Sequence, residues 1–282
     1  MPASGSPLSP RSLPPAHAAF LERALPTLSA DQRLVGVAAG GSYATDTMDD
    51  HSDLDLVIAI EPARAAAVMA ARRDVAASLG PLLGAFTGEH VGEPRLLICL
   101  YDPLPLHVDL KFVALDDVAS RVEDPAILWE RDGRMTAALA TRAAVYPGPD
   151  LAWIEERFWI WVHYAAVKIA RGELLEAVGF LAYLRSTVLG PLALERAGAT
   201  PAGVRRLESA APVWADAVRE TVSSCDAGSC WRALRASIRL YRALRSEPAD
   251  GTGATGVTPT FQPPSDIERV VTAFVDRIAP QS

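Results

Sequence analysis

The chain has 282 residues, a formal net charge of −7, 50% apolar residues and 22% charged residues. It is long enough for one large domain or two ordinary ones, and its composition excludes collagen-like and broadly disordered proteins. Because no block of five or more basic residues occurs, we expect no long nucleic acid as a partner. No uninterrupted apolar run reaches the roughly 18 to 20 residues that cross a bilayer, so we expect a soluble protein without a membrane partner.

Two further features of the composition predict where the protein resides. Residues 1–15 contain five prolines and lack the apolar stretch of a secretory signal, so we expect a disordered tail there. The three cysteines, Cys99, Cys225 and Cys230, are too few and too unevenly spaced for a disulfide framework, and no clustered His or Cys suggests zinc. Reduced thiols and the missing secretory signal favour a cytoplasmic protein.

The first half of the chain alternates predicted helices and strands. A helix is expected over 16–28, ending near Pro26, and an apolar strand over 34–39 runs into a turn of small residues. A buried strand is expected over 54–60, and an alanine-rich helix over 62–79 starts at a proline. This order of elements is α/β in character.

The pattern then changes from a hairpin to long helices. Strands over 96–101 and 106–113 are joined by a short proline-containing connection, as in a hairpin. Two prolines and a glycine in 146–150 predict a domain boundary. Beyond it, apolar residues at helical spacing predict a helical bundle, with helices over 151–171, 173–197, 202–223 interrupted at Pro212, and 229–245.

The C-terminal part is predicted to be a connector and a last helix. Residues 246–264 are rich in Gly, Pro and Thr, and Ser265 is placed to cap a helix that runs to about 278. We therefore divide the chain into a tail (1–15), a first domain (16–147), a helical domain (148–245), a flexible linker (246–264) and a C-terminal helix (265–282).

Three aspartates carry the chemical signal. Asp53 and Asp55 flank Leu54 at the start of an apolar strand, and because side chains alternate along a strand, both project from the same face. Carboxylates held this close repel unless a cation lies between them, and such oxygen ligands suit magnesium carrying a phosphate substrate. A third carboxylate, Asp109, lies within another apolar strand, where an unpartnered charge is costly.

The neighbours of Asp109 alternate in the same way. His107, Asp109 and Lys111 share one face of their strand, with apolar residues on the other. If this strand lies beside the strand that follows Asp53, Asp109 completes a triad of metal ligands. Lys111 then lies near enough to moderate the negative charge of the cluster.

These motifs resemble those of the nucleotidyltransferase superfamily that includes DNA polymerase beta and the aminoglycoside nucleotidyltransferases. The matching features are an apolar strand ending in Gly-Ser, an Asp-x-Asp about ten residues later, and a single Asp in a later strand, over about residues 34–113. One departure is the turn itself. Many members carry Arg directly after Gly-Ser and Gly a few residues on, whereas this chain has Tyr43 and Asp46 there.

The resemblance implies an α+β fold: an N-terminal nucleotidyltransferase domain with a small mixed sheet flanked by helices, then a helical bundle that binds substrate. It implies magnesium-dependent transfer of a nucleoside monophosphate, AMP from ATP, to a hydroxyl of a small molecule, with release of pyrophosphate. An aminoglycoside-like acceptor is the favoured class, which would make the protein an antibiotic-resistance enzyme.

The same resemblance assigns roles to single residues. Asp53 and Asp55 would hold two Mg²⁺ ions that grip the triphosphate, and Asp109 would bind the catalytic ion and accept the proton of the acceptor hydroxyl. Gly41 would permit close approach to the terminal phosphates, and Ser42 would donate to them through its backbone N–H and hydroxyl.

Several other residues have competing interpretations. Lys111 and Lys168 are the two lysines among 27 basic residues, and the resemblance suggests that Lys168 reaches the phosphates, although an exposed helix lysine is an equally good interpretation. His51 and His107 could serve as a base or ligand, but single histidines are more often structural. Cys99, within an apolar strand, is expected to be core.

The aromatic series in 153–164 is mainly packing on amphipathic grounds. Polar residues beside it, such as Glu155, Glu156 and His163, could line an acceptor pocket, but a structural role is favoured. The acidic run 46–55 does not fit a calcium EF-hand, because Leu54 replaces the turn glycine.

Two functions of other classes stay open. The acceptor could be a protein side chain, as in nucleotidyltransferase antitoxins, although about 130 additional residues of predicted helix argue against a minimal catalytic module. The chain could also be a non-catalytic nucleotide-binding regulatory module. The presence of all three carboxylates argues against that alternative, and Tyr43 in the phosphate turn keeps it open.

Overall fold

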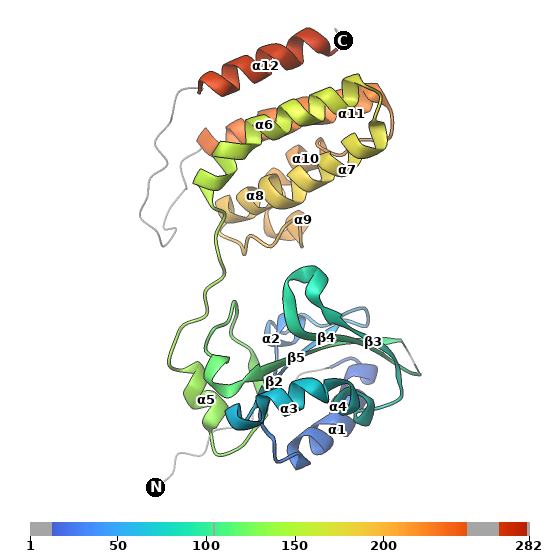
Figure 1. Ribbon diagram of the computed structural model, residues 1–282, viewed down its shortest axis with the longest axis vertical. Coiled ribbons are helices and arrows are strands. Elements are labelled where there is room, and N and C mark those ends of the chain that lie inside the picture. Colours follow the sequence, from blue (N-terminus) through green and yellow to red (C-terminus); the bar gives the residue numbers. More distant parts are fainter. Residues whose placement is uncertain (1–12, 104, 247–264, 281–282) are drawn as a thin grey trace. The chain divides into compact units, whose positions relative to one another are not determined.

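The protein is α+β, with an N-terminal mixed six-stranded sheet and its helices followed by a mainly helical region (Figure 1). The computed structural model describes residues 13–103, 105–246 and 265–280. The chain divides into two compact units, Met1–Val145 and Tyr146–Ser282. The predicted tail, except residues 13–15, and the predicted linker, except residue 246, lie outside the described residues.

The sheet has the strand order β3-β4-β5-β2-β1-β6. Neighbouring strands are antiparallel except for β2 and β5, which pair in parallel. The strand bounds are β1 Leu34–Ala39, β2 Leu54–Ile60, β3 Leu82–Gly88, β4 Glu93–Tyr101, β5 Leu106–Ala114 and β6 Ala126–Glu130. The four predicted strands are all present, and they form the contiguous centre of the sheet.

The sequence patterns did not predict β3 and β6, which are the two edge strands of the sheet. An edge strand has one neighbour and is only partly covered, so its sequence need not show the apolar run of a central strand. In β6 every residue is half-buried, and β3 contains two glycines. Both strands contain apolar residues, but the run in β6 is only four residues long and glycine interrupts the run in β3, so neither was predicted as a strand.

Two hydrophobic clusters cover the sheet. The larger one packs helices α1 (Pro15–Ala30), α3 (Ala65–Ala70) and α4 (Arg72–Ser78) on the face that carries Leu54, Leu56, Val108 and Leu110. A smaller cluster around the buried Met135 of α5 (Arg134–Leu139) includes residues from β1, β2 and β5. Asp55 lies between Leu54 and Leu56, and Asp109 lies between Val108 and Leu110. Because side chains alternate along a strand, both aspartates project from the face opposite the larger cluster.

Two predicted helices differ in detail from the structure. Helix α1 continues through Pro26 to Ala30. The prediction that it ends near Pro26 was wrong: Pro26 is exposed, so water can serve the carbonyl that loses its N–H partner, and buried Leu28 holds the last turn in the core. The helix predicted over 62–79 is a 3₁₀ turn, Pro62–Arg64, followed by the two short helices α3 and α4.

The second unit consists of helices around one apolar cluster. Their bounds are α6 Leu151–Ala170, α7 Leu174–Leu184, α8 Gly190–Arg196, α9 Leu207–Ala210, α10 Pro212–Arg219, α11 Ala227–Ser246 and α12 Asp266–Ile278. The helix predicted over 202–223 is two short helices, α9 and α10, because residues 203–206 form turns and α10 begins at Pro212. The predicted cap is present: the Ser265 side chain accepts a hydrogen bond from the Glu268 N–H.

The segment from α7 to α8 is a continuous helical run with a π-helical turn, Arg185–Leu189, just before Pro191. Pro191 cannot donate a backbone hydrogen bond, and a π turn is one way to absorb that loss. Within the described residues, Leu174–Arg196 is one helix long and apolar enough by composition to cross a membrane. Its most apolar window is 56% buried inside the unit, and Glu176 and Arg185 interrupt its apolar sequence.

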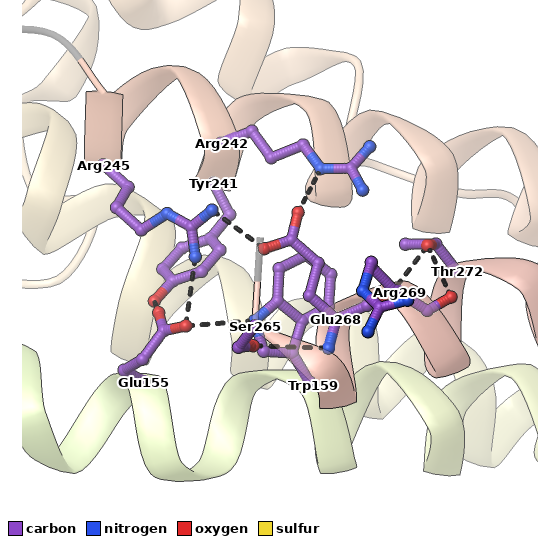
Figure 2. Close-up of polar contacts among 9 residues, drawn as sticks. All are labelled: Glu155, Trp159, Tyr241, Arg242, Arg245, Ser265, Glu268, Arg269 and Thr272. Atoms are coloured by element: carbon purple, nitrogen blue, oxygen red, sulfur yellow. Dashed lines mark hydrogen bonds and ion pairs between the residues drawn. The ribbon is translucent and has the colours of Figure 1, made fainter. Parts of the chain in front are cut away.

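A buried ion network ties α12 to α11 and α6 (Figure 2). The Glu268 side chain is 2% exposed and accepts hydrogen bonds at 2.8 Å from both Arg242 and Arg245. Arg245 also bonds Glu155 at 3.0 Å, and Glu155 accepts hydrogen bonds from Trp159 and Tyr241. The carboxylate of Glu155 is therefore used in packing the helices, as the structural interpretation of this residue predicts.

We expect Glu268→Gln to lower the free energy of unfolding of the second unit by about 2–3 kcal/mol, because it leaves two arginines beside a neutral group. Chemical denaturation followed by tryptophan fluorescence measures this loss. The matched control is Glu220→Gln, since Glu220 pairs with Arg239 at 3.1 Å on the exposed surface of the same unit. Equal effects of the two substitutions would contradict a special role for the buried pair.

Candidate active site

The parallel pairing of β2 and β5 brings two of the predicted acidic residues side by side. Asp55 is the register partner of Asp109, and neighbouring strands lie about 4.8 Å apart. Residues directly across a ladder share a face, so both carboxylates belong to the face opposite the larger core. Asp53 immediately precedes β2, and its charge acts on Asp109. The structure thus confirms that the two predicted strands are neighbours.

The carboxylate of Asp109 is held in a perturbed environment. Its side chain is 18% exposed, and its Oδ1 lies 2.9 Å from Nε2 of His107. Burial raises the pKa of Asp109, the negative charge of Asp53 raises it further, and His107 acts in the opposite direction. A carboxylate with a raised pKa is a stronger base than an ordinary aspartate.

The predicted phosphate turn, residues 40–42, packs against one of these acidic residues, Asp55; we call it the glycine turn. The Gly40 N–H donates to the Asp55 backbone carbonyl at 2.9 Å, and helix α2 (Gly41–Ala44) follows. Gly41 has φ of +55°, and a Cβ there would lie only 2.2 Å from Oδ2 of Asp55. Glycine is therefore required at position 41 because the backbone of the turn passes close to the Asp55 carboxylate.

Ser42 adds an unsatisfied hydroxyl to the glycine turn. The residue is 7% exposed, and its Oγ has no hydrogen-bond partner among the described residues. A buried hydroxyl without a partner costs free energy, and such groups in native proteins call for an explanation such as a missing ligand. Its place next to Gly41 fits the predicted role of donating to a phosphate.

One residue of the site was missed by sequence reasoning. Glu123 lies in the loop before β6, and its Oε1 accepts a hydrogen bond from the Gly41 N–H at 2.8 Å. Strand β6 pairs with β1 with Ala126 opposite Ala39, which brings the preceding loop beside the glycine turn. The apolar run of β6 is only four residues long, so the sequence alone predicted neither this strand nor a contact of Glu123 with a turn 82 residues away.

Lys111 lies on β5 as predicted, but its ammonium contacts a different carboxylate. Its Nζ is 2.9 Å from Glu93 on β4, and Glu93 also accepts two hydrogen bonds of 2.7 Å from Arg95. These two cations lower the pKa of Glu93 to about 2, with the Arg95 bond as the largest cause. The expectation that Lys111 moderates the aspartate cluster overlooked Glu93, which lay outside the predicted strand.

This ion cluster gives a pH-dependent prediction. We expect Glu93→Gln to destabilise the first unit by about 1–2 kcal/mol at pH 7, since solvent screens the half-exposed Arg95 and Lys111. The pKa of Glu93 falls from 4.5 to about 2 on folding, so this contribution is present above pH 4.5 and is lost as the pH falls toward 2. Urea unfolding at several pH values measures the difference between variant and wild type, and a constant difference over that range would contradict the assignment.

Lys168 lies on α6, in the second unit, within a local ion cluster. Its Nζ is 2.6 Å from Glu173 and 3.1 Å from Glu176, and these carboxylates raise its pKa. The ammonium also lies over the Tyr164 ring, 5.2 Å from the centroid. These contacts show how Lys168 is held inside its own unit, and its contact with nucleotide phosphates stays a prediction.

The remaining candidates have structural contacts. Cys99 is 2% exposed, as expected for a core residue. His163 packs its ring against Phe274 with centroids 4.7 Å apart, and Glu156 pairs with Arg157 at 2.9 Å. His51 is an exposed residue of the loop before β2.

A row of residues crosses the sheet through the paired aspartates. Phe86 on β3 is the register partner of Ile98 on β4, Ile98 of Asp109, and Asp109 of Asp55, whose carbonyl bonds Gly40. Phe86 is 57% exposed. The row therefore runs from the glycine turn, across the acidic pair, to the exposed Phe86 on the edge strand.

The predicted metal ligands, Asp53, Asp55 and Asp109, do not form a ready-made metal site. Among the described residues, no three His, Cys, Asp or Glu side chains are gathered closely enough to hold a metal ion as they stand. Asp109 is bonded to His107, and the Asp55 carboxylate lies against Gly41. The donor set itself, two paired carboxylates on the sheet and a third just before β2, consists of the oxygen ligands that Mg²⁺ prefers.

No family model matches this chain. No curated protein matches its sequence. Among solved structures, an aminoglycoside 6-adenyltransferase from Bacillus subtilis is structurally similar over 92% of this chain and 97% of its own, with 12% identity and a TM-score of 0.40. A nucleotidyltransferase-like protein from Exiguobacterium sibiricum is similar over 81% of this chain and 73% of its own, with 15% identity and a TM-score of 0.30.

Proposed function

We propose that the protein is a nucleotidyltransferase that transfers AMP from ATP to a hydroxyl of a small molecule and releases pyrophosphate. The observation that carries this proposal is the register pair of Asp55 and Asp109 on parallel strands, with the glycine turn packed directly on Asp55. The buried, unpartnered Ser42 hydroxyl in that turn fits a missing anionic ligand.

Each residue has a role in this reaction. The Gly41 N–H and the Ser42 hydroxyl bind phosphate oxygens of ATP. Asp109 accepts the proton of the acceptor hydroxyl, because its carboxylate lies beside Asp55 on the neighbouring strand. The acceptor oxygen attacks the α-phosphorus, the bond from that phosphorus to the bridging oxygen breaks, and pyrophosphate leaves with the displaced electron pair.

The three carboxylates are the residues that would hold Mg²⁺. Bound to Asp53, Asp55 and Asp109, the metal would neutralise phosphate charge and orient the attacking and leaving oxygens. Asp109 would have to leave its bond with His107 to take part. Burial and the negative charge of Asp53 raise the pKa of Asp109. A nearby cation favours the charged form of the carboxylate and so offsets both effects.

The row across the sheet suggests where each substrate binds. In-line displacement places the attacking and leaving oxygens on opposite sides of the phosphorus. With pyrophosphate at the glycine turn, the acceptor approaches from the side of Asp109 that faces Ile98 and Phe86. Aminoglycosides are the first acceptors to test.

An acidic protein whose described cysteines are all unpaired also fits our proposal of a cytoplasmic enzyme.

The direct test is magnesium-dependent release of pyrophosphate from ATP by the purified full chain, with a panel of aminoglycosides and other polyhydroxylated small molecules. We expect release that requires both Mg²⁺ and an acceptor, together with an acceptor product heavier by one adenylyl group. ATP binding by calorimetry without turnover across the panel would favour the regulatory alternative. An adenylyl group on a co-expressed protein would favour the protein-modifying alternative.

A further inference from the structure

The glycine turn already holds a carboxylate where the proposed function puts a phosphate. The Gly41 N–H donates to Oε1 of Glu123 at 2.8 Å. The same oxygen is 2.8 Å from the point where a Cβ on Gly40 would lie, and Cβ of Asp55 is 3.8 Å from that point. Glu123 is thus a fourth acidic residue beside the turn, and it uses one of the two donors that we assign to ATP.

The loop that carries Glu123 is anchored while its carboxylate stays accessible. Arg121 donates from Nε to Asp124 at 2.7 Å and from Nη1 to the Arg142 carbonyl at 2.7 Å. Ala126 then enters β6 opposite Ala39. The residue Glu123 itself is exposed, so its side chain can turn into water without displacing packed groups.

The turn does not depend on Glu123 for its shape. The Gly40 N–H is bonded to the Asp55 carbonyl at 2.9 Å, and the Ala44 and Thr45 N–H groups donate to the Gly40 and Gly41 carbonyls at 3.2 and 3.3 Å. These backbone bonds define the turn on both sides of the Gly41 N–H. The bond to Glu123 therefore satisfies the Gly41 N–H, which takes no part in these backbone bonds.

We propose that Glu123 is a placeholder for the nucleotide: its carboxylate occupies the Gly41 N–H in the free protein, and a phosphate oxygen of ATP displaces it. This inference rests on the proposed function and adds a residue that sets nucleotide affinity. The competition is direct, because one N–H serves one strong acceptor and two anions at the same donor repel each other. Glu123 touches no reacting atom and is not a catalytic residue.

The test compares ATP binding by the full-length wild type, Glu123→Gln and Glu123→Ala, measured by calorimetry with and without Mg²⁺. Removing a charge-assisted hydrogen bond that competes with the ligand is expected to tighten ATP binding about three- to tenfold for Glu123→Ala. Glu123→Gln keeps an acceptor without the charge, so we expect an intermediate affinity. The matched control is Glu22→Gln, an equal charge change at an exposed position of α1, which leaves the affinity unchanged.

A second readout reports on the donor itself. In the absence of nucleotide, amide hydrogen exchange at Gly41 is expected to be faster in Glu123→Ala than in the wild type. ATP is expected to slow it in both proteins, because the phosphate replaces the carboxylate as acceptor.

The outcomes separate this inference from the proposed function. Unchanged or weaker ATP binding by both variants, with pyrophosphate release retained, would overturn the placeholder and leave the nucleotidyltransferase intact. If no form of the protein binds ATP or releases pyrophosphate, both proposals fail. Tighter ATP binding in the order Ala, Gln, wild type supports the placeholder.

Discussion

Asp109→Asn is expected to lower kcat for pyrophosphate release by about 10²–10⁴, the usual contribution of a general base. The asparagine side chain has nearly the same shape but cannot accept the proton of the acceptor hydroxyl, and it is a poorer ligand for Mg²⁺. Stopped assays of pyrophosphate at saturating ATP and Mg²⁺ measure the loss. ATP affinity without metal is expected to change little, because Asp109 does not contact the glycine turn in the proposed role.

The same substitution is expected to leave the melting temperature unchanged or higher. Burial and Asp53 raise the pKa of Asp109, so its charge is unfavourable in the metal-free fold. Activity and stability therefore respond in opposite directions, as is common for residues kept for function. The control is Asp74→Asn on α4, an exposed aspartate in the layer of helices. Turnover of Asp109→Asn at the control level would show that Asp109 is not the base.

Gly41→Ala is expected to reduce kcat/KM for ATP by more than about a hundredfold and to destabilise the first unit by about 2–4 kcal/mol. Gly41 has a positive φ, and an added Cβ would collide with Oδ2 of Asp55 at 2.2 Å. The glycine turn or the Asp55 carboxylate must therefore move, and the proposed phosphate and metal sites are both disturbed. Steady-state kinetics and urea unfolding measure the two effects.

Gly92→Ala is the matched control for backbone strain. Gly92 also has a positive φ, of +76°, but its added Cβ meets nothing within 4 Å. We expect this variant to show only the strain of a left-handed alanine, about 1–2 kcal/mol, with normal kinetics. If Gly41→Ala behaves like Gly92→Ala in both assays, the contact between the glycine turn and Asp55 has no part in the reaction.

The central part of the fold was predictable because local patterns determine it. Period-two alternation separated Leu54 and Leu56 from Asp55, and the structure places the leucines in the core with Asp55 on the other face. The same pattern in β5 gave the face of Asp109. Ser265 was identified as a helix cap from its residue type and position alone, and it has that role.

The contacts that the sequence did not reveal depend on partners distant in the chain. Lys111 lies on the predicted face, but its ammonium forms an ion pair with Glu93 on the neighbouring strand. Glu123 reaches the glycine turn only because β6 pairs with β1, and the apolar run of β6, residues 126–129, is too short to predict that strand on its own. The ion network of Glu155 and Glu268 joins helices whose pairing no local pattern specifies.

The most direct test of the account is a crystal structure of the full chain with Mg²⁺ and a non-hydrolysable ATP analogue. We expect metal bound to oxygens of Asp53, Asp55 and Asp109 at about 2.0–2.1 Å, with a phosphate oxygen on the Gly41 N–H and Asp109 released from His107. Nucleotide and metal bound at another place, with the Asp109 bond to His107 intact, would contradict it.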